Sequence, residues 1–294
     1  MNVRAASSRF IVAGVCIVLF SANGFPKSWQ SQSKSLVPLE DILQRAGDRV
    51  QQYTASILNV VCTESTRRQE LEPDLKTEKN KPIELAYDFF IVLGSSFGIR
   101  EQRELKLING KPPAKNKRAP VPDTTAYTTA VVILLPEIRE NYTFTDAGIG
   151  DLDGRRVLIV DYAPAIRRPP SVSWEGARFR VNLQSKGRIW IDPESYDVLR
   201  LDSHLTEPYE FRSPKVAKNG PFVLFGPTHT FKMETSDVSI RFGSASFKDP
   251  EQTLMLPVSA ESFQVFEGTR VPRIRITHSF TNYRRFTSQV KIGQ

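Results

Sequence analysis

The residues best suited to covalent chemistry form the pentapeptide GSSFG at residues 94–98, which matches the G-x-S-x-G pattern of serine hydrolases. In such enzymes the central serine attacks a carbonyl carbon, a histidine takes its proton and an acidic residue orients the histidine. Ser96 is followed in the chain by His204, His229 and His278, so partners are available. The pattern needs a strand-to-helix turn, however, and the residues after it alternate as an extended strand. We therefore expect a loop between two strands, with a serine hydrolase using Ser96 as the alternative.

No other group of residues has the spacing of a metal or cofactor site. The three histidines are 25 and 49 residues apart in sequence, and neither interval is that of a metal-ligand pair. The two aspartates at residues 151–154 lack the later glutamate of a calcium-binding loop. No glycine-rich phosphate loop follows a strand. We expect no catalytic residue, no metal and no cofactor, and we expect His278 to be a hydrogen-bonded core residue.

The amino terminus has the pattern of a secretory signal peptide. Arg4 and Arg9 precede an apolar run from Phe10 to Phe20, which is shorter than the roughly 20 residues that a membrane-spanning helix needs. Ala22 and Gly24 are small residues at the positions expected before a cleavage site. The predicted organisation is a signal peptide at residues 1–24, a disordered linker at 25–37 and a single domain at 38–294. We expect a soluble periplasmic or secreted protein, and an uncleaved amino-terminal anchor is the alternative.

The cysteine content determines whether a disulfide can form, and the charge limits the class of partner. Cleavage would leave Cys62 as the only cysteine, so no intramolecular disulfide could form, and we expect a buried, unreactive thiol. The net charge of +8 would fall to about +6 with the loss of Arg4 and Arg9. The one dense basic stretch, at residues 111–118, has no interleaved aromatic residues, which argues against nucleic acid. Peripheral contact with an anionic membrane surface is compatible with this charge.

Periodicity predicts one long amphipathic helix followed by strands. Apolar residues recur every three or four positions at residues 39–61, directly after Pro38, although Gly47 costs up to about 1 kcal/mol relative to alanine. A charged stretch follows at residues 63–82. Residues 124–135 fit both a strand and a short buried helix. Long proline-rich connections at residues 163–179 and 206–227 are expected to form a lid or rim. Strands are predicted at residues 83–93, 99–108, 141–145, 155–162, 228–242, 254–266 and 273–286.

Residues 187–205 are predicted to form a hairpin, two strands joined by a tight turn, around which the other strands are arranged. Ile189 and Ile191 alternate with Arg188 and Trp190 before the turn, and three leucines, Leu199, Leu201 and Leu205, share one face after it. One apolar and one mixed face are typical of a half-buried antiparallel hairpin.

These elements resemble those of a known group of proteins. The leading helix, the W-I-D-P sequence at residues 190–193 and the N-Y-R-R-F sequence at residues 282–286 resemble an uncharacterised family of bacterial secreted proteins. The sheets of that family are similar to those of LolA-like periplasmic lipoprotein carriers and outer-membrane lipoprotein-sorting proteins. The resemblance spans residues 39–286. It implies an α+β fold in which a strongly curved antiparallel sheet, an incomplete β-barrel, is covered by the N-terminal amphipathic helix and short helices.

The same resemblance implies a function. In that fold the hollow, apolar side of the sheet accepts acyl chains, and reversible burial of a chain yields about 0.8 kcal/mol per methylene. We expect a non-enzymatic exported protein that binds a lipid or lipoprotein acyl chain in an apolar cavity, or acts as an envelope scaffold. A protein–protein interaction module is the second alternative to this reading. The expected cavity-lining residues come from either face of the strands: Trp190, Leu199, Leu201, Phe263, Val265, Ile274 and Ile276.

Overall fold

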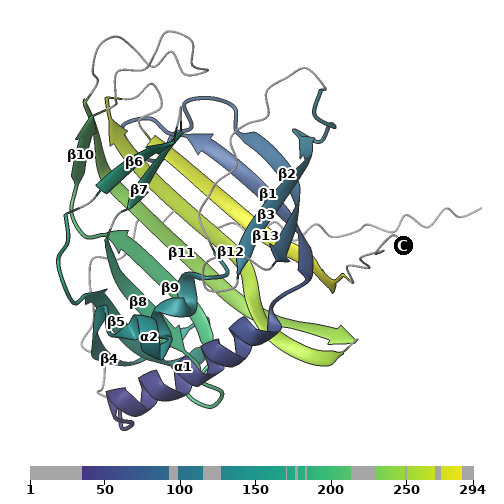
Figure 1. The fold of residues 1–294 in the computed structure, drawn as a ribbon. Helices are drawn as coiled ribbons and strands as arrows, with labels where there is room; N and C mark the ends of the chain where they lie inside the picture. The colour runs from purple at the N-terminus through teal and green to yellow at the C-terminus, as the bar shows by residue number, and fades with distance from the viewer. Residues whose placement is uncertain are drawn as a thin grey trace, which may run out of the picture. The chain divides into compact units, whose positions relative to one another are not determined.

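A computed structural model of the chain contains one large antiparallel sheet (Figure 1). The structure describes residues 35–92, 99–114, 127–169, 171–175, 178–182, 184–212, 230–248, 250–268 and 273–286. The predicted signal peptide, most of the predicted linker and the GSSFG sequence with Ser96 lie outside the described residues.

The chain has two helices, a short 3-10 helix and thirteen strands within these residues. In chain order they are α1 (Leu39–Ser56), β1 (Val60–Glu70), β2 (Ile83–Val92), β3 (Arg100–Ile108), η1 (Ala130–Leu134), α2 (Pro136–Arg139), β4 (Tyr142–Leu152), β5 (Arg155–Pro164), β6 (Ser171–Glu175), β7 (Arg178–Asn182), β8 (Ser185–Ile191), β9 (Val198–Leu205), β10 (Tyr209–Arg212), β11 (Thr230–Lys248), β12 (Glu251–Glu267) and β13 (Arg273–Arg285).

The main sheet has the strand order β3-β2-β1-β13-β12-β11-β9-β8-β5-β4, and every pairing in it is antiparallel. Strand β10 pairs with β11 beside this path, and β6 pairs with β7 in a separate two-stranded sheet. Because β3 and β4 at the two ends do not pair with each other, the sheet is not closed into a barrel. The predicted antiparallel architecture with few helices is thereby confirmed.

Cross-strand pairing divides the sheet into two faces. Residues that pair across neighbouring strands point to the same side of the sheet. By this criterion one side carries Phe280, Ile240, Leu201 and Ile189, and we call it the core face. The apolar residues of this face form the main core together with those of α1 and η1, and many have no exposed surface. The opposite, outer face carries many charged residues, among them Arg188 and Asp161, which form an ion pair of 2.6 Å.

Helix α1 packs into this core through one face. Ile42, Ala46 and Val50 recur at intervals of four and are buried, while the residues between them are mostly exposed. The helix packs against η1 and touches β12. Figure 1 shows it at the end of the sheet where β8 turns into β9. A helical cover over the rest of the core face stays a prediction.

The sequence placed the end of this helix too late. We expected it to continue to Val61, but α1 ends at Ser56 and strand β1 begins at Val60. Asn59 separates them with a φ of 62°, a left-handed conformation that stops a helix. Ile57 continues the helical periodicity only because it packs into the same core as α1.

Three further regions contain strands that the sequence did not predict. The charged stretch at residues 63–82 includes most of β1, the first long connection contains β6 and the start of β7, and the second contains β10. Strand β1 escaped prediction because Glu64 and Thr66 occupy core-face positions where an apolar residue is expected. In the ambiguous segment at residues 124–135, the described part folds as the short helix η1.

Candidate functional site

The structure does not bring the seven predicted lining residues together. Leu201, Ile274 and Ile276 lie on the core face, as their pairing with core-face residues shows. Leu201 is only 2% exposed and packed within the main core, whereas Ile274 is half-buried. The other four residues lie on the outer face: Trp190, Leu199, Phe263 and Val265.

Leu199 lies apart from Leu201 because of a β-bulge. Trp190 pairs with Arg200, but Ile191 pairs with Val198, so Leu199 is an extra residue in β9. It packs with a small outer-face cluster, formed with the buried residues of β5 and with Trp190. The three leucines of this hairpin therefore do not share one face, contrary to the expectation from simple alternation.

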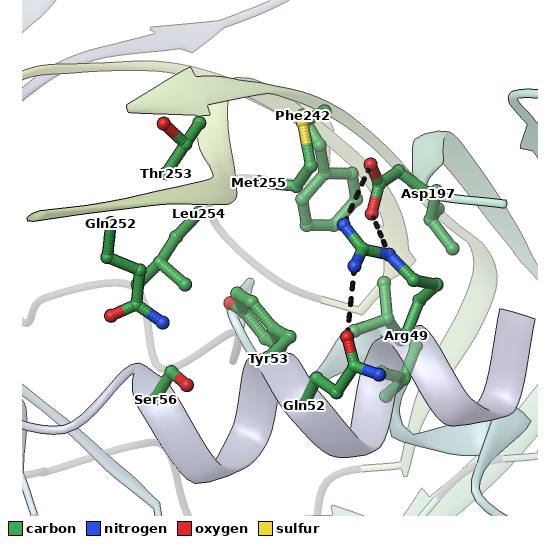
Figure 2. A pocket seen from close by; sticks show the side chains of 13 residues that line it. Arg49, Gln52, Tyr53, Ser56, Asp197, Phe242, Gln252, Thr253, Leu254 and Met255 are labelled. Carbon is green, nitrogen blue, oxygen red and sulfur yellow. Dashed lines mark hydrogen bonds and ion pairs between the residues drawn. The ribbon is translucent and has the colours of Figure 1, made fainter. Parts of the chain in front are cut away.

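An unfilled cavity lies between α1 and the hairpin that joins β11 to β12 (Figure 2). Its volume is about 120 Å³, which is close to that of an engineered cavity of about 150 Å³ that binds benzene. Figure 2 shows Tyr53 and Ser56 of α1 across from Leu254 and Met255 of the hairpin. We call this space the α1 cleft. It is lined by Arg49, Val50, Gln52, Tyr53, Ser56, Val131, Asp197, Val198, Phe242, Gln252, Thr253, Leu254 and Met255.

An ion pair between α1 and the turn after β8 forms one rim of the α1 cleft. Arg49 Nε and Nη2 donate to the two carboxylate oxygens of Asp197 at 2.9 and 3.3 Å, and Arg49 also donates to Gln52 at 2.9 Å. The Arg49 side chain is 43% exposed, so the pair contributes no more than about 1 kcal/mol. One turn earlier, Arg45 donates to the Tyr196 hydroxyl at 3.2 Å. These contacts position the helix without fastening it strongly.

A chain of buried polar groups crosses the core face beside the α1 cleft. A hydrogen bond of 2.9 Å joins the Tyr127 hydroxyl to His278 Nε2, and one of 2.8 Å joins His278 Nδ1 to Glu64. Arg103 Nε donates to the second Glu64 oxygen at 2.7 Å, and its guanidinium lies over the Phe89 ring. The prediction of His278 as a hydrogen-bonded core residue is confirmed.

The same chain continues from the sheet to the helices. Arg103 pairs with Glu101 at 3.4 Å, and Glu101 accepts a hydrogen bond of 2.6 Å from the Thr128 amide. The Tyr53 hydroxyl of α1 donates to the Thr128 carbonyl at 3.1 Å. Burial raises the pKa of the Glu101 carboxyl, while Arg103 and Thr128 oppose the rise. The network therefore connects β13, β1 and β3 to α1 and to the residues just before η1.

This network is buried. Glu64 and Tyr127 have no exposed surface and His278 is 4% exposed, so its hydrogen bonds are shielded from solvent. Cys62, on the same face, is also fully buried, and burial raises the pKa of its thiol to about 12. The predicted buried thiol is confirmed.

A second cavity, of about 480 Å³, lies mainly on the outer face of β13, β1, β2 and β3. Small side chains, Ser65, Ala86 and Ser279, form its floor in one row across neighbouring strands. Arg67 lines it but is paired with Glu78 at 2.7 Å. This groove could not be predicted from the sequence, because its small residues are not consecutive in the chain.

Within the described ranges, no cluster of three histidine, cysteine or carboxylate residues could hold a metal ion. None of the described helices is long and apolar enough to span a membrane.

No protein-family model matches the sequence, and no curated protein matches it. Solved structures do resemble it. A LolA-superfamily protein from Nitrosomonas europaea is 9% identical with a TM-score of 0.37, over 88% of this chain and 98% of that chain. An outer-membrane lipoprotein-sorting protein domain from Vibrio parahaemolyticus is 12% identical with a TM-score of 0.37, over 86% and 95%. A DUF1329-family protein from Desulfovibrio piger is 10% identical with a TM-score of 0.41, over 86% and 95%.

Sequence reasoning identified His278 but missed the other residues of the buried network. Glu101 and Arg103 are two positions apart in a predicted strand and therefore share a face. An acidic and a basic residue at that spacing were a usable signal for an ion pair. Glu64 gave none, because its strand was not recognised.

Proposed function

We propose that this chain is an exported, non-enzymatic protein that binds the apolar chain of a lipid or of a lipid-modified protein in the α1 cleft. The observation that carries the proposal is the cleft itself, a cavity of about 120 Å³ at the margin of the buried core. Val50, Phe242 and Leu254 give it apolar walls from both the helix and the sheet.

The volume of the cleft limits the ligand that fits while α1 keeps its present position. A volume of about 120 Å³ is below the roughly 300 Å³ at which complete small-molecule sites begin. It accepts the end of an acyl chain, and a longer chain enters only if α1 moves away from the hairpin. Because Arg49 and Asp197 hold that rim through a pair whose arginine is 43% exposed, displacing the helix costs little there.

In this proposal α1 and η1 act as the helical cover of the binding site. Their apolar residues, Val50 and Val131, line the cleft, and each methylene that replaces water between them and the hairpin yields about 0.8 kcal/mol. Ile274 and Ile276 remain proposed contacts for a longer ligand, further along the core face.

A cavity-filling variant tests the proposal. Dodecan-1-ol, a neutral single-chain probe, is titrated into the mature protein and binding is followed by native mass spectrometry. We expect one bound molecule per chain. Leu254→Phe puts a larger side chain into the cleft and should weaken binding about tenfold or more, the loss of roughly two buried methylenes.

The matched control is Val258→Phe, which enlarges an exposed residue of the same strand. It should bind dodecan-1-ol as the wild type does. Equal binding by both variants, or none by the wild type, would refute the proposal. A stoichiometric polypeptide that copurifies in place of lipid would instead favour an interaction module.

A further inference from the structure

A second polar site lies on the core face of β1, separate from the α1 cleft. A small pocket of about 10 Å³ is enclosed there by three neighbouring strands and Arg103 of β3, and this volume matches one water molecule or one ligand oxygen. It is lined by Glu64, Thr66, Arg68, Leu85, Tyr87, Arg103, Ile276 and His278.

Arg68 is the cation of this pocket that lacks a carboxylate. The residue is half-buried and sits between two isoleucines, since it pairs with Ile83 on β2 and with Ile276 on β13. Within the part of the chain that the structure describes, its guanidinium has no ion pair and no hydrogen bond. An arginine in such apolar surroundings is costly unless a counter-charge binds it.

Thr66, two residues earlier on the same face, has a buried hydroxyl with no hydrogen-bond partner among the described residues. The residue is only 6% exposed. Buried polar atoms are rarely left unpaired in folded proteins. The hydroxyl and the guanidinium line one pocket, so a single ligand oxygen can satisfy both.

The other charges around the pocket are already matched. Glu64 accepts hydrogen bonds from Arg103 and contacts His278, and Arg103 pairs with Glu101 as well. Glu70, the next carboxylate on this face of β1, accepts a hydrogen bond of 2.8 Å from Asn80. Of the charged residues that line the pocket, Glu64 and Arg103 pair with each other, and Arg68 is the one without an ion pair among the described residues.

We propose that Arg68 and Thr66 form a binding site for an oxyanion, a carboxylate or phosphate group, on the core face of the sheet. A guanidinium presents paired N–H donors that match two oxygens of such a group, and the threonine hydroxyl supplies a further donor. The oxyanion comes either from the head group of an amphiphile or from a free small anion.

Three probes separate these sources: dodecanoate below its micelle concentration, dodecan-1-ol and inorganic phosphate, each titrated by calorimetry. We expect dodecanoate to bind about 10- to 100-fold more tightly than dodecan-1-ol, the factor expected from charge-assisted hydrogen bonds. Phosphate that binds with similar affinity identifies a free anion as the ligand, whereas phosphate that does not bind identifies an amphiphile head group.

Arg68→Gln should abolish the preference for the acid or the binding of phosphate. The matched control is Arg67→Gln, because Arg67 is the adjacent residue, points to the outer face and is already paired with Glu78. Thr66→Val should also weaken anion binding while the melting temperature of the free protein stays unchanged or rises, since an unpaired buried hydroxyl is removed.

The inference is overturned if dodecanoate and dodecan-1-ol bind equally and phosphate does not bind, or if anion binding survives Arg68→Gln. Its failure is distinguishable from that of the proposed function. Loss of dodecan-1-ol binding in Leu254→Phe tests the α1 cleft alone, and phosphate binding that depends on Arg68 tests this pocket alone.

Discussion

Glu64 is a carboxylate with no exposed surface, and its two oxygens contact Arg103 at 2.7 Å and His278 at 2.8 Å. Burying a carboxylate is costly, and the cost is recovered only through such contacts. Removing the charge takes from Arg103 its contact at 2.7 Å, while its contact with Glu101 at 3.4 Å remains. Glu64 alone therefore accounts for much of the polar contact between β1 and its neighbours on the core face.

Glu64→Gln should lower the free energy of unfolding by about 3 kcal/mol, measured by urea denaturation, because a buried pair loses one partner. The control is Glu78→Gln, whose partner Arg67 is 46% exposed, and which should change stability by less than about 1 kcal/mol. Similar losses in the two variants would contradict the account of the buried network.

The Cys62 thiol gives the fold a stability term that depends on pH. Burial raises its pKa to about 12 in the folded chain, against roughly 8.5 in an unfolded chain. Because the folded state binds this proton more tightly, the term is complete below about pH 8.5 and is lost as the pH rises toward 12.

Between pH 8 and pH 10, wild-type protein should therefore lose about 2 kcal/mol more stability than Cys62→Ala, measured by urea denaturation at each pH. The thiol should also fail to react with Ellman's reagent at pH 8 until the protein is unfolded. Rapid labelling of folded protein would show that the thiol is accessible.

At the scale of elements, Gly47 explains how closely α1 approaches η1. A Cβ atom added at residue 47 would lie 2.8 Å from the backbone carbonyl oxygen of Leu134, closer than two packed atoms can stay. The sequence showed only the cost of a glycine within a helix. The structure adds its reason, since the two helices meet at that point.

Gly47→Ala should therefore destabilise the protein by about 1 to 3 kcal/mol, as overpacking does, although alanine is the better helix former by about 1 kcal/mol. Gln51→Ala, at an exposed position of the same helix, should be neutral or slightly stabilising. Thermal unfolding of both variants measures the difference. A more stable Gly47→Ala variant would show that the helix and η1 are less close.

A strand could be predicted from the sequence where its buried positions carry apolar side chains. Strands β2, β5, β8 and β13 were predicted within a few residues because their buried positions carry apolar residues, such as Phe89, Val160 and Ile189. Strand β1 was missed because Glu64 and Thr66 stand at two such positions. A β-bulge puts Leu199 on the outer face, and the pattern of apolar residues in the sequence does not reveal it.

For the whole molecule, the sequence was sufficient to predict an antiparallel sheet with few helices but not where its cavities lie. The α1 cleft combines residues from α1, η1, β9 and the β11–β12 hairpin, which are far apart in the chain. Their proximity depends on a strand order in which β1 pairs with β13, and no local pattern encodes that pairing.

Methionine methyl groups offer the most direct test of the central claim, that an apolar chain binds in the α1 cleft. The sequence has three methionines, Met1, Met233 and Met255, and only the last two lie outside the predicted signal peptide. Met255 lines the cleft and Met233 does not. NMR spectra of protein labelled with ¹³C at its methionine methyl groups should therefore report binding at one position and provide a control at the other.

On titration with dodecan-1-ol, the Met255 methyl signal should shift and show nuclear Overhauser effects to the methylene protons of the probe, while the Met233 signal stays in place. The Met255→Leu variant assigns the two signals. If the Met255 signal is unchanged at saturating dodecan-1-ol, or only Met233 responds, the chain does not bind in the α1 cleft.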